Sequence, residues 1–246
     1  MKTLAVTNQK GGVGKSSASL AIAHSLAARG LKVLVCDLDP QGNTSATLRA
    51  DGLKPSVLDV LQGDTSITEA IRAAGSVHIL PADKAAITAM DSLDVTALKA
   101  ALEEVAGFYD FCVIDTPPAL DKMQLNALAA AQSIVIPVQA DTYSLMGLED
   151  LIGTLATVKA SLNPSLKVAG IFFNVYNPRA ILSRELKEDF EEIAARLDTR
   201  LFDAAIRRGQ AITDASALRK PLREYAPKAG ITQDYEALTS ELLERL

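Results

Sequence analysis

Short apolar runs alternate with longer amphipathic stretches along the chain. The runs at 32–36 and 111–114 show no polar–apolar alternation, which is typical of strands buried on both faces of a parallel sheet. The pattern predicts strands at 3–7, 32–36, 77–80, 111–114, 134–138 and 168–173.

The stretches between several of these runs carry apolar residues at helical spacing. One such face consists of Val95, Leu98, Leu102 and Val105, and another of Leu145, Leu148, Ile152, Leu155 and Val158. Strand–helix alternation predicts an α/β fold with one doubly wound, mostly parallel sheet flanked by helices. We expect a single domain over 1–246, with the Gly-, Asp-, Thr- and Ser-rich segment 38–66 as its least regular part.

Composition limits the cellular compartment and the binding partners that we expect for the protein. The chain has 246 residues and a formal net charge of −5, so it has no general attraction to nucleic acid or anionic membranes. Cys36 and Cys112 lie within apolar runs and are expected to be buried, reduced thiols. No apolar run approaches the roughly 20 residues that span a bilayer, and the first predicted strand begins too early for a signal peptide. We therefore expect a cytoplasmic protein.

A glycine-rich segment at 8–17 joins the first predicted strand to an Ala- and Leu-rich helical stretch. Gly11, Gly12 and Gly14 allow the backbone to turn its N–H groups into one concavity, and the helix N-terminus adds the positive end of its dipole. This is the arrangement of a P-loop, which binds nucleotide phosphates.

Polar residues complete the expected loop. Lys15 supplies a cation for the β- and γ-phosphates, and the Ser16 hydroxyl is a ligand for Mg²⁺. Gln9 stands where the usual pattern has glycine, and the loop carries a second lysine, Lys10, near its start.

Two acidic motifs follow predicted strands, at the edge of the sheet where ligands bind in such folds. Asp37 and Asp39 come after the strand 32–36, and Asp115 follows the strand 111–114. Asp115 is expected to support Mg²⁺ directly or through water, which leaves Asp39 to orient the attacking water. The alternatives are a helix-capping role for Asp37 or Asp39 and a simple turn after Asp115.

Together, the segments 10–16, 37–41 and 113–118 resemble the deviant Walker ATPases of the ParA/MinD group, most closely its ParA branch. The similarity continues through 174–179 and 207–221. The resemblance implies a switch with ATP and Mg²⁺ as cofactors, which binds nonspecific double-stranded DNA as an ATP dimer and partitions or positions a plasmid, chromosome or protein complex. It also implies slow intrinsic ATP hydrolysis, stimulated by a ParB-like partner, and association with the nucleoid.

The resemblance further assigns roles to residues. Lys10 would reach the partner subunit's phosphates in a homodimer, and it joins Lys15 and Asp39 as the catalytic set. Asn174 would contact the adenine edge, while Ser16 and Asp115 would hold the metal. The residues around the triphosphate would be Lys10, Gly11, Gly12, Val13, Gly14, Lys15, Ser16 and Ser17.

This chain departs from the family pattern at two places. Ser16 and Ser17 replace the commoner threonines, a change that keeps the hydroxyl groups. The proline that usually helps to shape the adenine pocket is missing around Ile206, so the resemblance does not predict base contacts there.

A basic segment at 200–223 is the candidate DNA-binding surface. Its six cations stand against only Asp203 and Asp214, and Arg179 and Lys187 would extend it. Phosphate contacts by such residues are independent of base sequence and sensitive to salt. The alternative is a solvated helical face. The candidates are Arg200, Arg207, Arg208, Arg219, Lys220 and Arg223.

Other functions stay open at this point. A MinD-like spatial regulator would carry a basic amphipathic helix for lipid, but the last helical stretch, 234–246, is mostly acidic, so we expect no membrane partner. A metabolic P-loop synthetase would use ATP to activate a carboxylate and would need insertions for its substrate pocket. An iron–sulfur relative would need bridging cysteines, which Cys36 and Cys112 do not supply.

Overall fold

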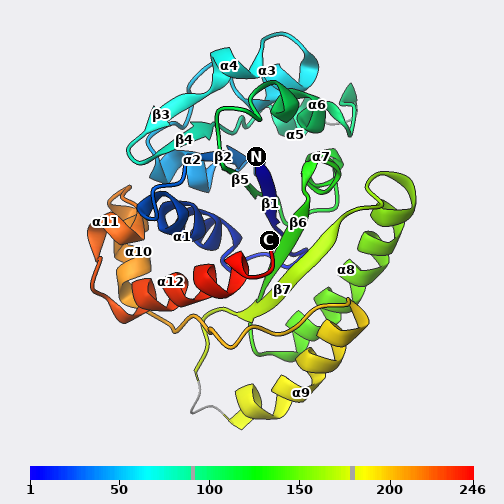
Figure 1. Ribbon diagram of the computed structural model, residues 1–246, viewed down its shortest axis with the longest axis vertical. Helices are drawn as coiled ribbons and strands as arrows, with labels where there is room; N and C mark the ends of the chain where they lie inside the picture. The colour runs from blue at the N-terminus through cyan, green and yellow to red at the C-terminus, as the bar shows by residue number, and fades with distance from the viewer. Residues whose placement is uncertain (90–91, 178–180) are drawn as a thin grey trace.

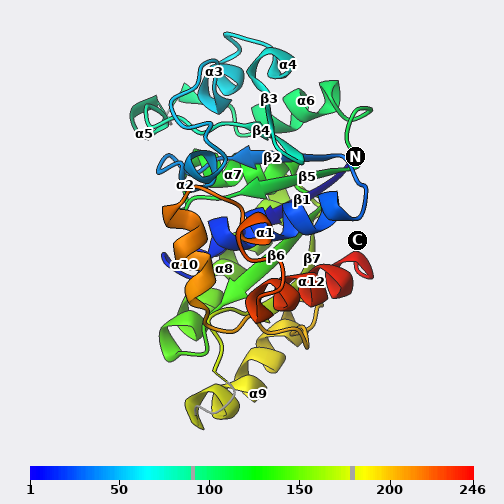
Figure 2. The same ribbon diagram turned by 90° about the vertical axis from the view of Figure 1, so that its left-hand side faces the viewer.

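The computed structural model describes residues 1–89, 92–177 and 181–246, and Figures 1 and 2 show how its elements are arranged. A seven-stranded sheet forms the centre, with the strand order β3-β4-β2-β5-β1-β6-β7. All neighbouring strands are parallel except β3 and β4. The strands are β1 (Lys2–Val6), β2 (Val33–Asp37), β3 (Arg72–Ala74), β4 (Val77–Leu80), β5 (Phe111–Asp115), β6 (Ser133–Val138) and β7 (Lys167–Phe173).

The structure confirms the predicted α/β fold and all six predicted strands, whose ends differ from the prediction by one residue at most. The seventh strand, β3, was missed. It has only three residues, none of them fully buried, and it pairs with β4 at the antiparallel edge of the sheet. Such a short, half-exposed strand has no apolar run to reveal it.

Helices cover both faces of the sheet (Figure 1). Leu34 and Val35 are neighbours on β2 but face opposite cores, and both are fully buried. Their burial explains why the predicted strands are apolar without alternation. The helices are α1 (Lys15–Ala28), α2 (Asn43–Thr47), α3 (Val57–Gln62), α4 (Ile67–Ala70), α5 (Ala86–Ala89), α6 (Ala97–Glu104), α7 (Lys122–Ala130), α8 (Thr142–Ser161), α9 (Ile181–Arg196), α10 (Gln210–Ala217), α11 (Leu222–Tyr225) and α12 (Gly230–Leu243).

The segment 38–66 is more regular than its composition suggested, because it contains α2 and α3. A capping box formed by Ser56 and Asp59 begins α3, and Val57 and Leu61 on this helix are buried. The apolar residues between the turn formers therefore anchor the segment to the core.

The strand order brings together the three segments that carry the predicted chemistry. Because β5 lies between β1 and β2, the loop after β1, the residues after β2 and the last residue of β5 meet at one edge of the sheet. Figure 2 shows these strands side by side. Within the described ranges, no helix has both the length and the apolar composition needed to cross a membrane.

Candidate nucleotide-binding site

The loop between β1 and α1 turns at two glycines with left-handed backbone conformations. Gly12 has a φ of 75° and Gly14 a φ of 87°, values that favour glycine. A Cβ on Gly14 would also collide with the Asn174 amide. No described side chain caps the N-terminus of α1, and the first turn of this helix contains no acidic residue. Its free N–H groups and its dipole therefore offer a fitting site for phosphate.

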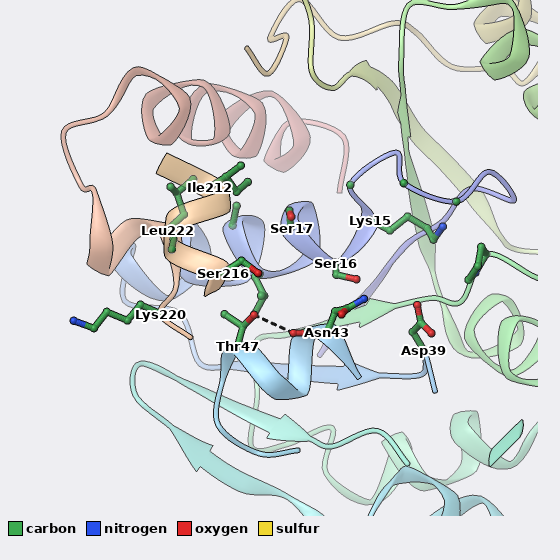
Figure 3. A pocket seen from close by; sticks show the side chains of 17 residues that line it. Lys15, Ser16, Ser17, Asp39, Asn43, Thr47, Ile212, Ser216, Lys220 and Leu222 are labelled. Atoms are coloured by element: carbon green, nitrogen blue, oxygen red, sulfur yellow. Dashed lines mark hydrogen bonds between the residues drawn. The ribbon is translucent and has the colours of Figure 1, made fainter. Parts of the chain in front are cut away.

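Lys15 is folded back onto this loop. The side chain is largely buried, and Nζ donates a hydrogen bond to the carbonyl oxygen of Lys10 at 3.1 Å. Burial lowers the pKa of Lys15, while the nearby Asp115 and Asp39 raise it. Figure 3 shows Lys15, Ser16 and Asp39 around the same part of the cavity. The ammonium thus lies where phosphate oxygens would complete its hydrogen bonding.

Asp115 ends β5 as a fully buried carboxylate. It accepts hydrogen bonds from the Thr44 hydroxyl at 2.7 Å and the Ser19 hydroxyl at 3.2 Å. Burial raises the pKa of Asp115 to about 6, although hydrogen bonds from Thr44 and Ser16 lower it. Ser16, Thr44 and Asp115 therefore form a compact set of oxygen atoms.

Asp37 is a second fully buried carboxylate, and it holds the start of α2. Its Oδ2 accepts hydrogen bonds from the amide and the hydroxyl of Ser45, both at 2.7 Å. Burial and the neighbouring Asp115 raise the pKa of Asp37 to about 8.

Asp39, by contrast, lies at the cavity wall, and its carboxylate accepts a hydrogen bond from the backbone amide of Gln41 at 2.9 Å.

Two neighbouring cavities surround the loop. The first has a volume of about 280 Å³ and lies between the loop, Asp39, α2 and α10. The second has a volume of about 320 Å³ and extends from the loop to Asn174, Arg208 and Gln210. Gly12, Gly14, Ser17 and Ile212 line both cavities. The space at the loop thus continues on both sides, as a nucleotide with a triphosphate and a base requires.

The donor set fits Mg²⁺ as well as phosphate. Ser16 and Asp115 supply oxygen atoms, the ligands that Mg²⁺ prefers, and this ion usually takes few protein ligands beside phosphate and water. The described residues contain no cluster of three or more His, Cys, Asp or Glu side chains suited to a metal. Sequence reasoning missed Thr44 and Ser45 as site residues; their position directly after the 37–43 motif was the available signal.

Lys10 lies apart from the oxygen atoms around Ser16. Its Nζ is 2.8 Å from both carboxylate oxygens of Asp141 and 3.1 Å from the Ser144 hydroxyl. The pair with Asp141 is partly exposed. The Lys10 ammonium is therefore held at the surface of its own subunit by α8 and its N-cap residue.

Asn174 lies behind the loop, where both polar groups of its side chain are engaged. Nδ2 donates to the carbonyl oxygen of Val13 at 2.7 Å, and Oδ1 accepts from the Val175 amide at 3.0 Å. Val13 itself is fully buried. Asn174 thus supports the loop and also lines the second cavity. Ile206, where the usual proline is missing, is buried and donates a backbone hydrogen bond to Phe173 at 2.8 Å.

The structure pairs most of the candidate DNA-binding cations with acids. Arg207 and Asp234 are 2.7 Å apart, Arg200 and Glu244 3.7 Å, and Arg219 and Arg223 pair with Asp51 and Glu236. These acids lie outside 200–223, so counting charge within the segment overstated its positive field. Arg208 and Lys220 form no ion pair within the described part of the chain.

Lys187 and Arg179 were the two suggested extensions of this surface, and only Lys187 lies within the described residues. Lys187 pairs with Glu191 on its own helix at 3.5 Å, and Arg179 lies outside the described residues. Figure 3 shows the side chain of Lys220 pointing away from the cavity. Lys220 and Arg208, both exposed, are therefore the candidate cations that are open to an external phosphate.

Fold and site together define a P-loop NTPase. The AAA_31 family model, described as an AAA domain, matches residues 1–168. The chain is 34% identical to the chromosome-partitioning ATPase Soj of Thermus thermophilus, with 100% of this chain and 97% of the relative covered. It is 33% identical to the chromosome partitioning protein ParA of Caulobacter vibrioides, with 100% and 95% covered. The chain therefore belongs to the Soj/ParA family of ATPases.

A solved structure shows a similar fold with a bound nucleotide. It is described as cobyrinic acid a,c-diamide synthase from Mycobacterium smegmatis with bound ADP and magnesium. Its TM-score to this chain is 0.84 and its sequence identity 30%, with 99% of this chain and 94% of that chain covered. A second structure of the same protein contains an ATP analogue and magnesium.

Proposed function

We propose that this protein is a switch ATPase with ATP and Mg²⁺ as cofactors, which dimerises when ATP binds and partitions or positions a cargo on nonspecific double-stranded DNA. It acts as a single domain over 1–246 in the cytoplasm, associated with the nucleoid. The names of its relatives support the partitioning role, and the Mycobacterium smegmatis structures support the cofactors.

Lys10 is the residue that carries this proposal. The Lys15 ammonium lies on the P-loop, next to the expected phosphate site of its own subunit. The Lys10 ammonium is held away from that site by Asp141. A second lysine at the rim of a phosphate site can serve a phosphate on a facing subunit. The charge of a bound triphosphate there would draw the ammonium away from Asp141, which makes association depend on the γ-phosphate.

The remaining residues act within one subunit. Lys15 and the N–H groups of Gly11–Gly14 and α1 hold the phosphates, while Ser16 and Asp115 hold the metal directly or through water. Bound Mg²⁺ supplies neutralising charge at the phosphates. Asp39 orients the attacking water, and Asn174 faces the base in the second cavity.

The intrinsic rate of hydrolysis is slow. No arginine is among the described residues that line the phosphate cavity, so none of these residues supplies a guanidinium to the transition-state charge in cis. A ParB-like partner stimulates hydrolysis by supplying or positioning the missing charge.

An ATP-dependent synthetase is the second candidate, because a structure described as a synthase is 30% identical to this chain. The expectation that a synthetase needs large insertions is not supported, since the alignment covers 94% of that synthase chain. A ligase role would not require ATP-dependent binding to DNA.

Binding to random-sequence duplex DNA separates the two functions. The Asp39→Ala variant, which slows hydrolysis, is titrated with labelled DNA in Mg·ATP and in Mg·ADP over a salt series. The switch predicts binding only with ATP, falling steeply with salt, and Lys15→Ala is the control that loses it. Absent binding, or equal binding in both nucleotides, would reject the DNA-bound switch and favour the synthetase.

A further inference from the structure

Three cations gather at the amino ends of the strands, at the edge of the sheet opposite the nucleotide site. Lys2 begins β1, Lys167 begins β7, and Arg245 follows α12. Together with Ser133, the first residue of β6, they line a cavity of about 270 Å³. Figure 2 shows the two chain ends, marked N and C, at this edge of the sheet.

Strand register explains why these side chains meet. Leu4 on β1 pairs with Ser133, and Ser133 pairs with Lys167. Lys2 lies two residues before Leu4 and therefore on the same face of the sheet. Ser133 and Lys167 therefore lie side by side on adjacent strands, and Lys2 lies on the same face, two residues before the β1 residue that pairs with Ser133. Because β6 lies between β1 and β7 and strands lie about 4.8 Å apart, the two lysine backbones are at least about 10 Å apart, and both side chains line the same cavity as Ser133.

Arg245 lines the same cavity from the side of the helical layer. Its Nε donates to the carbonyl oxygen of Ala169 on β7 at 3.3 Å, and Leu4 faces the core that α12 covers. The guanidinium is thereby held against the same face of the sheet as the two lysines. Three strands and the segment after α12 thus contribute to the lining of the cavity.

The described part of the chain gives these cations no carboxylate partner, although the Lys2 ammonium lies over the Phe111 ring, 5.9 Å from its centre. Lys2, Lys167 and Arg245 form no ion pair there. Two carboxylates in adjoining segments are engaged elsewhere, since Asp110 accepts from the Lys32 amide at 2.7 Å and Glu244 lies 3.7 Å from Arg200.

We propose that this cavity binds a phosphate group, borne either by a small phosphorylated molecule or by the DNA backbone. Lys2 and Lys167 donate from two sides, the hydroxyl of the buried Ser133 donates from the floor, and Arg245 donates from the α12 side. The site is separate from the P-loop and does not depend on the proposed switch.

Inorganic phosphate is the first probe. It is titrated into protein saturated with Mg·ADP, so that the P-loop is already filled, at an ionic strength held constant with chloride. The NMR amide signals of Lys2, Ser133 and Lys167 are expected to shift and saturate. Lys167→Gln and Arg245→Gln should each weaken binding about tenfold. Lys99→Gln, which removes an exposed charge on α6, should leave binding unchanged.

A short DNA duplex distinguishes the two sources of phosphate. If the duplex shifts the same signals and competes with inorganic phosphate, the ligand is the DNA backbone; if only inorganic phosphate does so, the ligand is a small phosphorylated molecule. No response to either probe would overturn the proposal. So would an equal response in Lys167→Gln, Arg245→Gln and Lys99→Gln, provided that all three unfold at the temperature of the wild type.

Discussion

Asp37 and Asp115 pair across β2 and β5, and at the residue scale these two buried carboxylates set the charge of the site. Burial raises the pKa of Asp37 to about 8 and the pKa of Asp115 to about 6. Asp37 therefore holds a proton more readily than Asp115 does. The hydrogen bonds from Ser45 favour the ionised form of Asp37 and oppose this rise, while the lower pKa of Asp115 suits it to holding a cation.

Stability should therefore depend on the protonation of Asp37. Its pKa rises from 3.8 to about 8 on folding, so the folded state binds the proton more tightly, and the stability it contributes is lost as pH rises towards 8. Between pH 5.5 and 8, we expect the free energy of unfolding of the metal-free protein to fall by about 1–3 kcal/mol. Asp37→Asn should flatten this fall in urea titrations with EDTA; an unchanged slope would contradict the assignment.

Replacing Lys15 should weaken nucleotide binding far more than replacing Lys10. Lys15→Ala removes the cation next to the phosphates and should weaken binding of Mg·ATP about 100-fold or more. Lys10 pairs with Asp141 in the same subunit, so Lys10→Ala should change monomer affinity less than about threefold. Titration with a fluorescent ATP analogue measures both values, and an equal loss in the two variants would refute the division of roles.

At the scale of elements, close approach between segments matters more than local propensity. A Cβ on Gly170 of β7 would lie too close to three ring carbons of Phe202, whereas a Cβ on Gly153 of α8 meets nothing within 4 Å. Gly170→Ala should destabilise the fold by about 1–3 kcal/mol through overpacking. Gly153→Ala should stabilise it by about 0.5–1 kcal/mol, because alanine favours helix. Urea unfolding tests both, and a stable Gly170→Ala would show that β7 and the segment 201–207 can separate.

Two cations of the basic segment at 200–223, Lys220 and Arg207, should contribute differently to DNA binding. Lys220 is free of ion pairs within the described ranges, and Arg207 is bound to Asp234. If this surface binds DNA, Lys220→Gln should weaken binding and reduce the slope against log salt by about one. Arg207→Gln should change the slope less. A larger effect from Arg207→Gln would mean that its ion pair opens on DNA.

Sequence predicted the elements better than it predicted their contacts. The strands, α1 and the P-loop follow from local patterns, because each apolar run and each glycine acts within a few residues of chain. The pairing of Arg207 with Asp234, of Arg219 with Asp51 and of Lys10 with Asp141 joins residues far apart in sequence. No periodicity encodes such contacts, so the exposed charge of the basic segment could be known only from the fold.

At the scale of the whole molecule, α2 connects the buried carboxylate of Asp115 to the basic segment. Thr44 at its start donates to Asp115, while the carbonyl oxygen of Ala46 accepts from Arg219 Nε at 2.7 Å. A displacement of α2 when a cation is bound at Asp115 would therefore change the hydrogen bond between Arg219 and the carbonyl oxygen of Ala46. This route gives the proposed switch a physical path from nucleotide to surface.

In the proposed switch, ATP, and not ADP, joins two subunits through Lys10. The most direct measurement is the molar mass in solution, by light scattering, of Asp39→Ala in Mg·ATP and in Mg·ADP. We predict twice the monomer mass with ATP and the monomer mass with ADP, and monomers in both nucleotides when Lys10→Ala is added. A single mass in both nucleotides, or an ATP dimer that survives Lys10→Ala, would contradict the account.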